Sequence, residues 1–264
     1  MLKKLFETEK IEYFSSLSYG DVEVIREDII AREAFAPRSV IVYLVPYYAG
    51  KTVNLSKYAA ARDYHLYIRD LNQRLISELK KTYPENSFKG YGDSSPVDER
   101  LAALSAGLGI LGDNRLLINE KYGSYVFIGE IITDVEPELL GAVAPSPIMR
   151  CRGCGICKSS CPTAHLENRL CECLSNITQR KGELTEKEIE IMRKCRTVWG
   201  CDVCQDVCPY NKNPIETPIS FFKENRIEEL TEDIVNSMSK QDFSERAFAW
   251  RGIKTLKRNL DYMN

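Results

Sequence analysis

The segment Cys151-Arg-Gly-Cys154-Gly-Ile-Cys157-Lys-Ser-Ser-Cys161-Pro162 carries the strongest structural signal in this chain of 264 residues. Its cysteines have the spacing C-x2-C-x2-C-x3-C-P. Three thiolates at this close spacing can wrap one [4Fe–4S] cluster, and the fourth cysteine can then bind a second cluster. The segment therefore predicts a module that holds two iron–sulfur clusters.

A second cysteine group, Cys201-Asp-Val-Cys204-Gln-Asp-Val-Cys208-Pro209, has the spacing C-x2-C-x3-C-P and lacks an adjacent first cysteine. Cys173, or less favourably Cys171, can complete it from upstream. In the bacterial ferredoxin pattern, the fourth ligand crosses to the other cluster. This predicts one cluster on Cys151, Cys154, Cys157 and Cys208, and a second on Cys173, Cys201, Cys204 and Cys161. Cys171 and Cys195 then remain as free thiols.

The distribution of the cysteines supports a local module. All ten lie between Cys151 and Cys208, whereas a disulfide framework would spread its bridges over the chain. The alternative is a pair of structural zinc sites. Zinc ribbons use two C-x2-C knuckles per ion and have no need for a third close cysteine or a C-P ending. The pattern therefore favours iron–sulfur clusters and electron transfer over zinc.

Composition and charge set wider limits. Lys and Arg number 36 and Asp and Glu number 38, a formal net charge of −2 that excludes a polycation but allows a local basic face. The N-terminus has no apolar core of signal-peptide length, and no run approaches the roughly 20 apolar residues that span a bilayer. We therefore predict a cytoplasmic protein without a membrane partner.

Periodicity predicts the main elements. Residues 39–48 indicate a buried strand, residues 62–81 an amphipathic helix and residues 97–105 a second helix. The runs 115–119 and 124–133 are typical of a hairpin, and a helical pattern covers 226–238.

Three prolines within residues 135–149 mark a boundary before the cysteines. These features predict an α/β (α+β) domain over 1–145, a ferredoxin-like double-cluster domain over 146–215 and a helical, basic tail over 216–264.

Gly107-Leu-Gly109-Ile-Leu-Gly112 satisfies the letters of the dinucleotide fingerprint G-x-G-x-x-G. That fingerprint requires a strand before the glycines and a helix after them, and here the predicted order is the reverse. A helix end followed by a tight turn explains the glycines, and they could also let another large cofactor approach the backbone.

Two short segments of the cysteine-free part are candidates for an acceptor site. The first contains His65, which is more simply explained as a packed or solvated helical residue than as a ligand. The second is Gly92-Asp93-Ser94-Ser95-Pro96. Asp93 is either a turn or capping residue, or a buried carboxylic acid that donates a proton and needs a raised pKa.

Several groups of residues recur together in one known family. They are Arg62-Asp63-Tyr64-His65, Asp93-Ser94-Ser95-Pro96, Ala106 to Asn114, Gly123-Ser124-Tyr125 with Gly129-Glu130, Cys173-Leu-Ser175-Asn-Ile-Thr178 with Lys181-Gly182, and Gly200 to Gln205. With the cysteines they cover about residues 35–215. On these residues the chain resembles the epoxyqueuosine reductases, cobalamin-dependent enzymes with two [4Fe–4S] clusters that complete queuosine in tRNA.

The resemblance implies a cobalamin-binding α/β domain similar to that of reductive dehalogenases, fused to the ferredoxin-like domain. It makes Asp93 the candidate proton donor. By the same likeness, the cofactor contacts are His65, Asn114 and Ser124 from the first domain, and Ser175 and Asp202 beside the cluster cysteines. The glycine segment would then lie close to the corrin.

Two departures from the family pattern bear on the substrate. Asp113 stands where the family usually has lysine, and longer members carry a C-terminal helical-repeat region that the sequence lacks. The tail segment 246–258 is basic with two aromatic residues, so it either meets RNA phosphates or forms a helix with a solvated basic face.

The leading hypothesis is a reductase that converts epoxyqueuosine to queuosine in tRNA and takes electrons from a low-potential donor such as ferredoxin or flavodoxin. One alternative is a corrinoid reductase of a non-tRNA substrate. The other is a ferredoxin-type electron carrier with no catalytic site.

Overall fold

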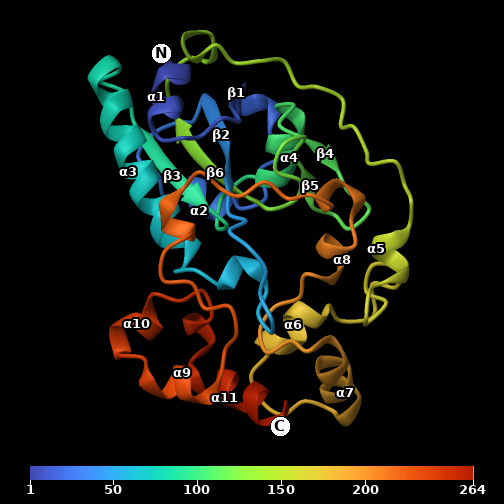
Figure 1. The fold of residues 1–264 in the computed structure, drawn as a ribbon. Helices are drawn as coiled ribbons and strands as arrows, with labels where there is room; N and C mark the ends of the chain where they lie inside the picture. The colour runs from blue at the N-terminus through green and yellow to red at the C-terminus, as the bar shows by residue number, and fades with distance from the viewer. Residues whose placement is uncertain (264) are drawn as a thin grey trace. The chain divides into compact units, whose positions relative to one another are not determined.

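The computed structural model describes residues 1–263, and the chain forms two compact units (Figure 1). Unit 1 comprises Met1–Pro46 and His65–Arg152. Unit 2 comprises Tyr47–Tyr64 and the described residues from Gly153 onward. This division differs from the predicted one: the boundary falls after Arg152, the tail shares a unit with the cysteines, and residues 47–64 leave the first domain to join the second.

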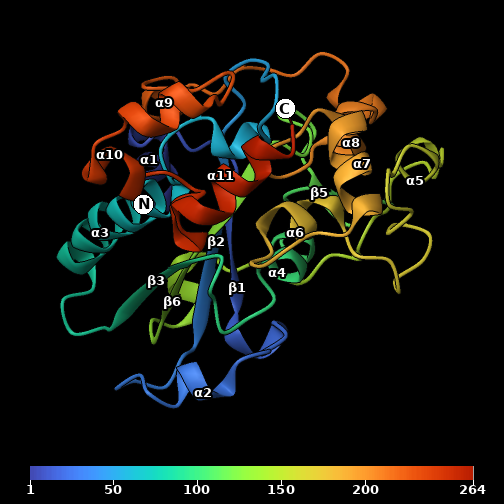
Figure 2. The same ribbon diagram turned by 90° about the horizontal axis from the view of Figure 1, so that it is seen from below.

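Unit 1 is built on an antiparallel sheet with the strand order β1-β2-β6-β3, which Figure 2 shows from right to left. The strands are β1 (Phe14–Ser18), β2 (Ser39–Pro46), β3 (Phe88–Gly92) and β6 (Val126–Thr133). Every residue of β2 is buried, because its run of β-branched and aromatic side chains fills both faces of a central strand. The strand predicted over 39–48 is therefore confirmed.

Helices cover both faces of this sheet. α3 (Tyr64–Thr82) confirms the helix predicted over 62–81 and buries Ile68, Leu71, Leu75 and Leu79 at helical spacing. Its Asn72 side chain accepts a hydrogen bond from the Tyr43 hydroxyl of β2 at 2.8 Å. α4 (Glu99–Ser105) packs its alanines and leucines against Val42 and Leu44, whose side chains leave β2 on the opposite face from Tyr43. The unit thus has three layers.

The remaining elements of unit 1 are short: α1 (Leu2–Thr8), η1 (Tyr19–Asp21), α2 (Glu27–Ile30), β4 (Ile110–Leu111), β5 (Leu117–Ile118) and η3 (Pro137–Leu140). The predicted hairpin between 115–119 and 124–133 is wrong. β6 is paired on both sides, by β2 and β3, so it has no edge left for β5, which pairs with β4 instead. A single bridge between Asn119 and Gly123 is all that joins the two runs.

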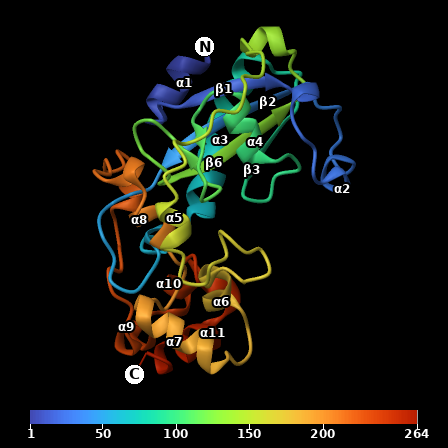
Figure 3. The same ribbon diagram turned by 90° about the vertical axis from the view of Figure 1, so that its right-hand side faces the viewer.

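Unit 2 is a set of short helices joined by loops (Figure 3). They are η2 (Lys57–Ala59), α5 (Ile156–Ser159), α6 (Leu174–Gln179), α7 (Glu186–Cys195), α8 (Val203–Asp206), η4 (Pro209–Asn211), η5 (Ser220–Phe222), α9 (Glu232–Ser237), α10 (Lys240–Ser244), η6 (Ala249–Arg251) and α11 (Ile253–Asp261). The helical pattern predicted over 226–238 is realised only from Glu232, where Thr231 caps the helix by accepting the Ile234 N–H.

Residues 47–64 are part of unit 2 because their backbone and side chains are bound there. Leu55 forms a parallel bridge with Trp199, a fully buried residue of the unit's main hydrophobic core. The Asn54 side chain exchanges two hydrogen bonds of 2.8 Å with the backbone of Leu230. Trp199 also packs edge-on against Phe248 of the tail. One core therefore joins the inserted loop, the residues around Trp199 and the tail.

Among residues 1–263, no helix has both the length and the apolar character needed to cross a membrane.

Candidate functional site

All ten cysteines lie in the described part of the chain, and none of them forms a disulfide. Several of the predicted cluster ligands stand in or beside short helices of unit 2: Cys157 in α5, Cys173 before α6 and Cys204 in α8. The loop between Cys151 and Cys157 contains Gly153 and Gly155 at φ angles of +66° and +73°, which glycine adopts without strain. Such loops turn successive N–H groups inward, as anionic sites require.

Four predicted ligands of one cluster influence one another in unit 2. Burial raises the pKa of Cys204 to about 12, and the charges of Cys173 and Cys161 add to the shift. Burial also raises the pKa of Cys201, again with a contribution from Cys173. The structure thus brings Cys161, Cys173 and Cys201 within electrostatic reach of Cys204, which also feels the charge of Cys157, a predicted ligand of the other cluster.

Backbone amides are already directed at two of these sulfurs. The N–H groups of Ser175 and Asn176 lower the pKa of Cys173, against a larger rise caused by burial. The Val203 N–H acts in the same direction on Cys201. N–H···S hydrogen bonds favour thiolates and are one of the features that set a cluster's reduction potential. A thiol set with such donors fits an iron–sulfur cluster.

In the described part of the chain, no three His, Cys, Asp or Glu side chains converge on a position that could hold a single metal ion. The ligands of a cubane need not converge, since each binds a different iron.

Cys151 is the first cysteine of the chain, and it belongs to unit 1. Its N–H donates to the Leu111 carbonyl at 2.9 Å, and its sulfur accepts the Asp113 N–H at 3.3 Å. Because Asp113 contacts the sulfur through its backbone, this contact is the same whether residue 113 is aspartate or lysine.

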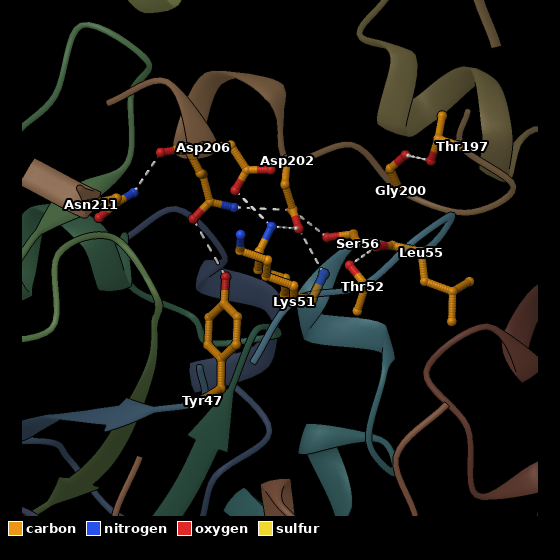
Figure 4. A network of polar contacts seen from close by, with 12 residues as sticks. Tyr47, Lys51, Thr52, Leu55, Ser56, Thr197, Gly200, Asp202, Asp206 and Asn211 are labelled. Atoms are coloured by element: carbon orange, nitrogen blue, oxygen red, sulfur yellow. Dashed lines mark hydrogen bonds and ion pairs between the residues drawn. The ribbon is translucent and has the colours of Figure 1, made fainter. Parts of the chain in front are cut away.

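Asp202, a predicted cofactor contact, lies buried in unit 2 with both carboxylate oxygens hydrogen-bonded (Figure 4). Ser56 Oγ donates to Oδ1 at 2.5 Å, and the Lys57 N–H donates to Oδ2 at 2.7 Å. The Lys57 ammonium, whose side chain is 9% exposed, lies 3.4 Å from Oδ2 and 2.6 Å from Asp206 Oδ1. Burial raises the pKa of Asp202, and the Lys57 charge opposes the rise. Asp202 therefore fastens the 47–64 loop beside Cys201.

The same loop is held a second time at Gln205. The Tyr47 hydroxyl donates to Gln205 Oε1 at 3.4 Å, and Asn211 Nδ2 donates to the Gln205 carbonyl at 2.9 Å (Figure 4). The sequence analysis assigned no role to Ser56, Lys57 or Tyr47. Nothing in their local pattern links them to cysteines about 150 residues away, so only the fold reveals them.

Asp93 and His65, both candidates from the sequence, meet in unit 1. His65 Nε2 of α3 lies 3.5 Å from Asp93 Oδ2. Asp93 follows the last residue of β3 and has a φ of +67°, a left-handed conformation that is uncommon for residues other than glycine. Its N–H donates to Glu99 Oε2 at 3.2 Å. The loop thus presents the Asp93 carboxylate between an imidazole and a second carboxyl group.

The structure corrects two expectations about Asp93. Its side chain is 63% exposed, so the buried carboxylic acid foreseen for this position is not Asp93 itself. It does not cap the following helix either: Asp98 does so, by accepting the Leu101 N–H at 2.9 Å. The more buried acid is its neighbour Glu99, a half-buried residue where desolvation and then the Asp93 charge raise the pKa to about 7.

Glu130 is a second buried acid, and the sequence analysis gave it no role. It belongs to β6, is 0% exposed, and neither carboxyl oxygen has a hydrogen-bond partner. Burial raises its pKa to about 8; the nearby Ser95 hydroxyl opposes the rise and the Glu99 charge adds to it. A signal was present in the sequence, since Glu130 is the one charged residue in the apolar run of β6.

The other predicted contacts are spread over both units. Asn114 and Ser124 are 6% and 5% exposed in unit 1, on the segment between β4 and β6. Ser175 lies in α6 of unit 2, where its hydroxyl accepts a hydrogen bond from Gln179 at 3.0 Å.

The glycine segment has an explanation within unit 1. Gly107, at φ +74°, ends α4, and the strand β4 follows, which is the order predicted. A Cβ on Gly109 would lie 2.6 Å from the Ile118 carbonyl oxygen, and one on Gly112 would lie 2.3 Å from Asn114 Oδ1. The chain's own packing therefore requires these glycines, without a dinucleotide.

These features define an iron–sulfur protein in which a cysteine module accompanies a second unit bearing an acid site. The comparisons agree. Residues 150–211 match the 4Fe-4S double cluster binding domain, and residues 30–94 match the epoxyqueuosine reductase QueG domain DUF1730.

The epoxyqueuosine reductase of Listeria monocytogenes is 31% identical over 97% of this chain and 71% of its own length. That of Leadbetterella byssophila is 31% identical over 86% of this chain and 77% of its own. The chain therefore belongs to the epoxyqueuosine reductase family. An epoxyqueuosine reductase solved with a modified tRNA-Tyr stem loop shares the fold at a TM-score of 0.81, with 21% identity over 99% of this chain and 80% of that one.

Proposed function

We propose that this protein reduces epoxyqueuosine to queuosine in tRNA. The observation that carries the proposal is that one chain of this family combines the complete set of predicted cluster cysteines with the His65–Asp93–Glu99 site. The relatives matched over most of this chain are epoxyqueuosine reductases, and a solved relative is bound to an epoxyqueuosine-modified stem loop.

Two kinds of cofactor belong to this proposal. The clusters, held by the eight cysteines predicted above, supply single electrons at low potential. Cobalamin supplies a strongly reducing and nucleophilic cobalt centre.

The α+β unit is the proposed corrinoid-binding domain, and its donor set suits that group. A corrin is fringed by neutral amides, and His65, Asn114 and Ser124 of this unit offer neutral imidazole, amide and hydroxyl groups. Asp202 differs, because its oxygens already bind Ser56 and Lys57. We therefore propose that Asp202 acts on the site only by positioning its loop.

The protein's own residues handle the proton. Opening an epoxide leaves an oxygen that must be protonated before it can depart as water. The Asp93 carboxyl group is exposed, so it can take up and release a proton. His65 Nε2 lies 3.5 Å from Asp93 Oδ2 and can orient the carboxyl group or balance its charge. Asp93 is thus the proposed acid, and His65 its positioning partner.

The tRNA is the proposed partner, and the tail offers a surface for it. Trp250 is 61% exposed, and the Arg251 guanidinium lies 3.8 Å from the centre of its ring. An exposed aromatic ring beside a cation can stack on a base and meet a phosphate. We further propose that a ferredoxin or flavodoxin donates the electrons and that the reaction takes place in the cytoplasm, where tRNA is modified.

The test is an anaerobic assay of the reconstituted holoenzyme on epoxyqueuosine-containing tRNA, with a chemical reductant and queuosine read by mass spectrometry. The proposal expects queuosine to form on tRNA. Conversion of the free nucleoside with no conversion of tRNA would favour a corrinoid reductase of a small substrate. Normal cluster reduction with no retained cobalamin and no queuosine would favour an electron carrier.

A further inference from the structure

The proposed reaction needs more protons than one acid can hold. Converting an epoxide to an alkene breaks two C–O bonds and forms one water molecule, so it consumes two electrons and two protons. The electrons come one at a time from the low-potential donor through the clusters. Asp93 has a single carboxyl group and can deliver one proton before it must be reloaded. The stoichiometry therefore requires that Asp93 be reloaded once in each turnover, either by solvent or by an acid beside it.

Glu99 lies next to Asp93 and is half-buried. It occupies the first turn of α4, and its Oε2 accepts the Asp93 N–H at 3.2 Å. That bond holds the left-handed Asp93 residue against the start of the helix. The pair is close enough for the charge on one carboxyl group to change the proton affinity of the other.

Glu130 lies behind this pair, on the sheet face that α4 covers. It stands directly opposite Tyr91 of β3, two residues before Asp93 in the chain. Ile128 and Ile132, its neighbours at alternate positions of β6, belong to the apolar clusters on that face. The Glu130 carboxyl group is therefore surrounded by apolar side chains. An unpartnered carboxyl group there is costly in the ionised form, and the nearby Glu99 charge raises its pKa further.

We propose that Glu99 and Glu130 hold the second proton of the reaction and reload Asp93. This inference rests on the proposed function. After protonated Asp93 gives its proton to the opened oxygen, it is a carboxylate; Glu99 then transfers a proton to it and becomes the carboxylate. The reloaded Asp93 gives the second proton, and water departs. Glu130 and, after turnover, solvent return the proton to Glu99.

The ionisation of the two acids agrees with this role. Burial raises the pKa of Glu99 to about 7 and that of Glu130 to about 8, so both hold protons near neutral pH. The groups that face them are His65 of α3, Asp93 of the loop and Asp98 before α4, with the Ser95 hydroxyl and the Tyr91 side chain of β3. Only His65 among these can carry a positive charge.

The kinetic test compares Glu99→Gln and Glu130→Gln with the unchanged holoenzyme on an epoxyqueuosine-modified tRNA stem loop. In the unchanged enzyme, turnover should fall as the pH rises through 7 to 8, because Glu99 and Glu130 lose their protons in this range. Glu99→Gln should lower turnover by about 10- to 100-fold, less than the largest effects of a positioned acid, and should remove that alkaline fall. Glu130→Gln should move the fall to lower pH, because Glu99 loses its proton supply.

Asp98→Asn is the matched control. Asparagine caps a helix about as well as aspartate, so the variant removes one charge that faces both acids without removing a proton carrier. Its turnover at neutral pH should stay within about twofold of the unchanged enzyme. A loss as large as that of Glu99→Gln would show that local charge, and not a held proton, matters.

A second readout does not depend on activity. The infrared spectrum of the protein at neutral pH should contain the carbonyl stretch of protonated carboxylic acids, and Glu130→Gln should lose the part of this band that belongs to Glu130. The inference is overturned if both glutamine variants keep the rate and the alkaline fall, or if the band is absent from the unchanged protein. The absence of queuosine from tRNA treated with the unchanged holoenzyme would instead refute the proposed function.

Discussion

The cysteine module of unit 2 and the acid site of unit 1 are assembled in different ways. Three of the module's ligands, Cys154, Cys157 and Cys161, lie within eight residues of each other. The acid site draws on separate parts of the chain: α3 supplies His65, the end of β3 supplies Asp93, and β6 supplies Glu130. Metal ligands can thus be found from local spacing, whereas an acid's environment depends on strand register and burial.

The largest expected effect concerns the ligand that completes the second cluster. Cys173→Ser should reduce the bound iron to about half and abolish turnover, because one of two clusters loses a thiolate. Cys171→Ser is the matched control and should keep the full iron content. Iron analysis and cluster absorption measure both. Retention of all iron in Cys173→Ser with a loss in Cys171→Ser would reverse the assignment.

The next effect concerns the loop that is bound beside Cys201. Asp202→Ala should lower the free energy of unfolding of unit 2 by about 3–5 kcal/mol, because it leaves the buried Lys57 ammonium without its buried partner. Asp206→Asn alters the exposed partner of the same lysine and should cost about 0–1 kcal/mol. Both tryptophans of the chain, Trp199 and Trp250, belong to unit 2, so their fluorescence during denaturation reports on this unit. Equal effects of the two variants would contradict the account.

The last effect is a pH dependence of the stability of unit 1. Glu130 has an ordinary pKa of 4.5 and a folded pKa of about 8, so between these values the folded protein holds a proton that the unfolded chain has released. Stability should therefore fall as pH rises through this range, by at most about 1.4 kcal/mol per pH unit. Hydrogen exchange of the β6 amides measures it. Glu130→Gln should flatten the slope, and an unchanged slope would show that Glu130 is not the titrating group.

Much of unit 1 was predictable, because its signals are local. The apolar run 39–48 and the periodic helix 62–81 formed as predicted. The hairpin failed for a non-local reason: the strand Val126–Thr133 fills the centre of the sheet, and no pattern within it states which strands occupy its two edges.

The acid site of unit 1 was predicted only in part, because some of its features depend on non-local packing. Asp93 and His65 were recognised by resemblance, and their 3.5 Å approach agrees with a shared role. The exposure of Asp93 and the burial of Glu99 could not be read from the segment, because both depend on how the loop packs over β6. The role of the 47–64 loop was likewise hidden, since it depends on contacts with Leu230 and Asp202 far along the chain.

The central claim is that unit 2 handles electrons while unit 1 handles protons. It is tested most directly by Asp93→Ala in the reconstituted holoenzyme, with queuosine formation on tRNA and dithionite reduction of the clusters measured on the same sample. The account predicts that turnover falls by about 10²- to 10⁴-fold while the clusters are reduced as in the unchanged protein. Queuosine formation at the unchanged rate would contradict it.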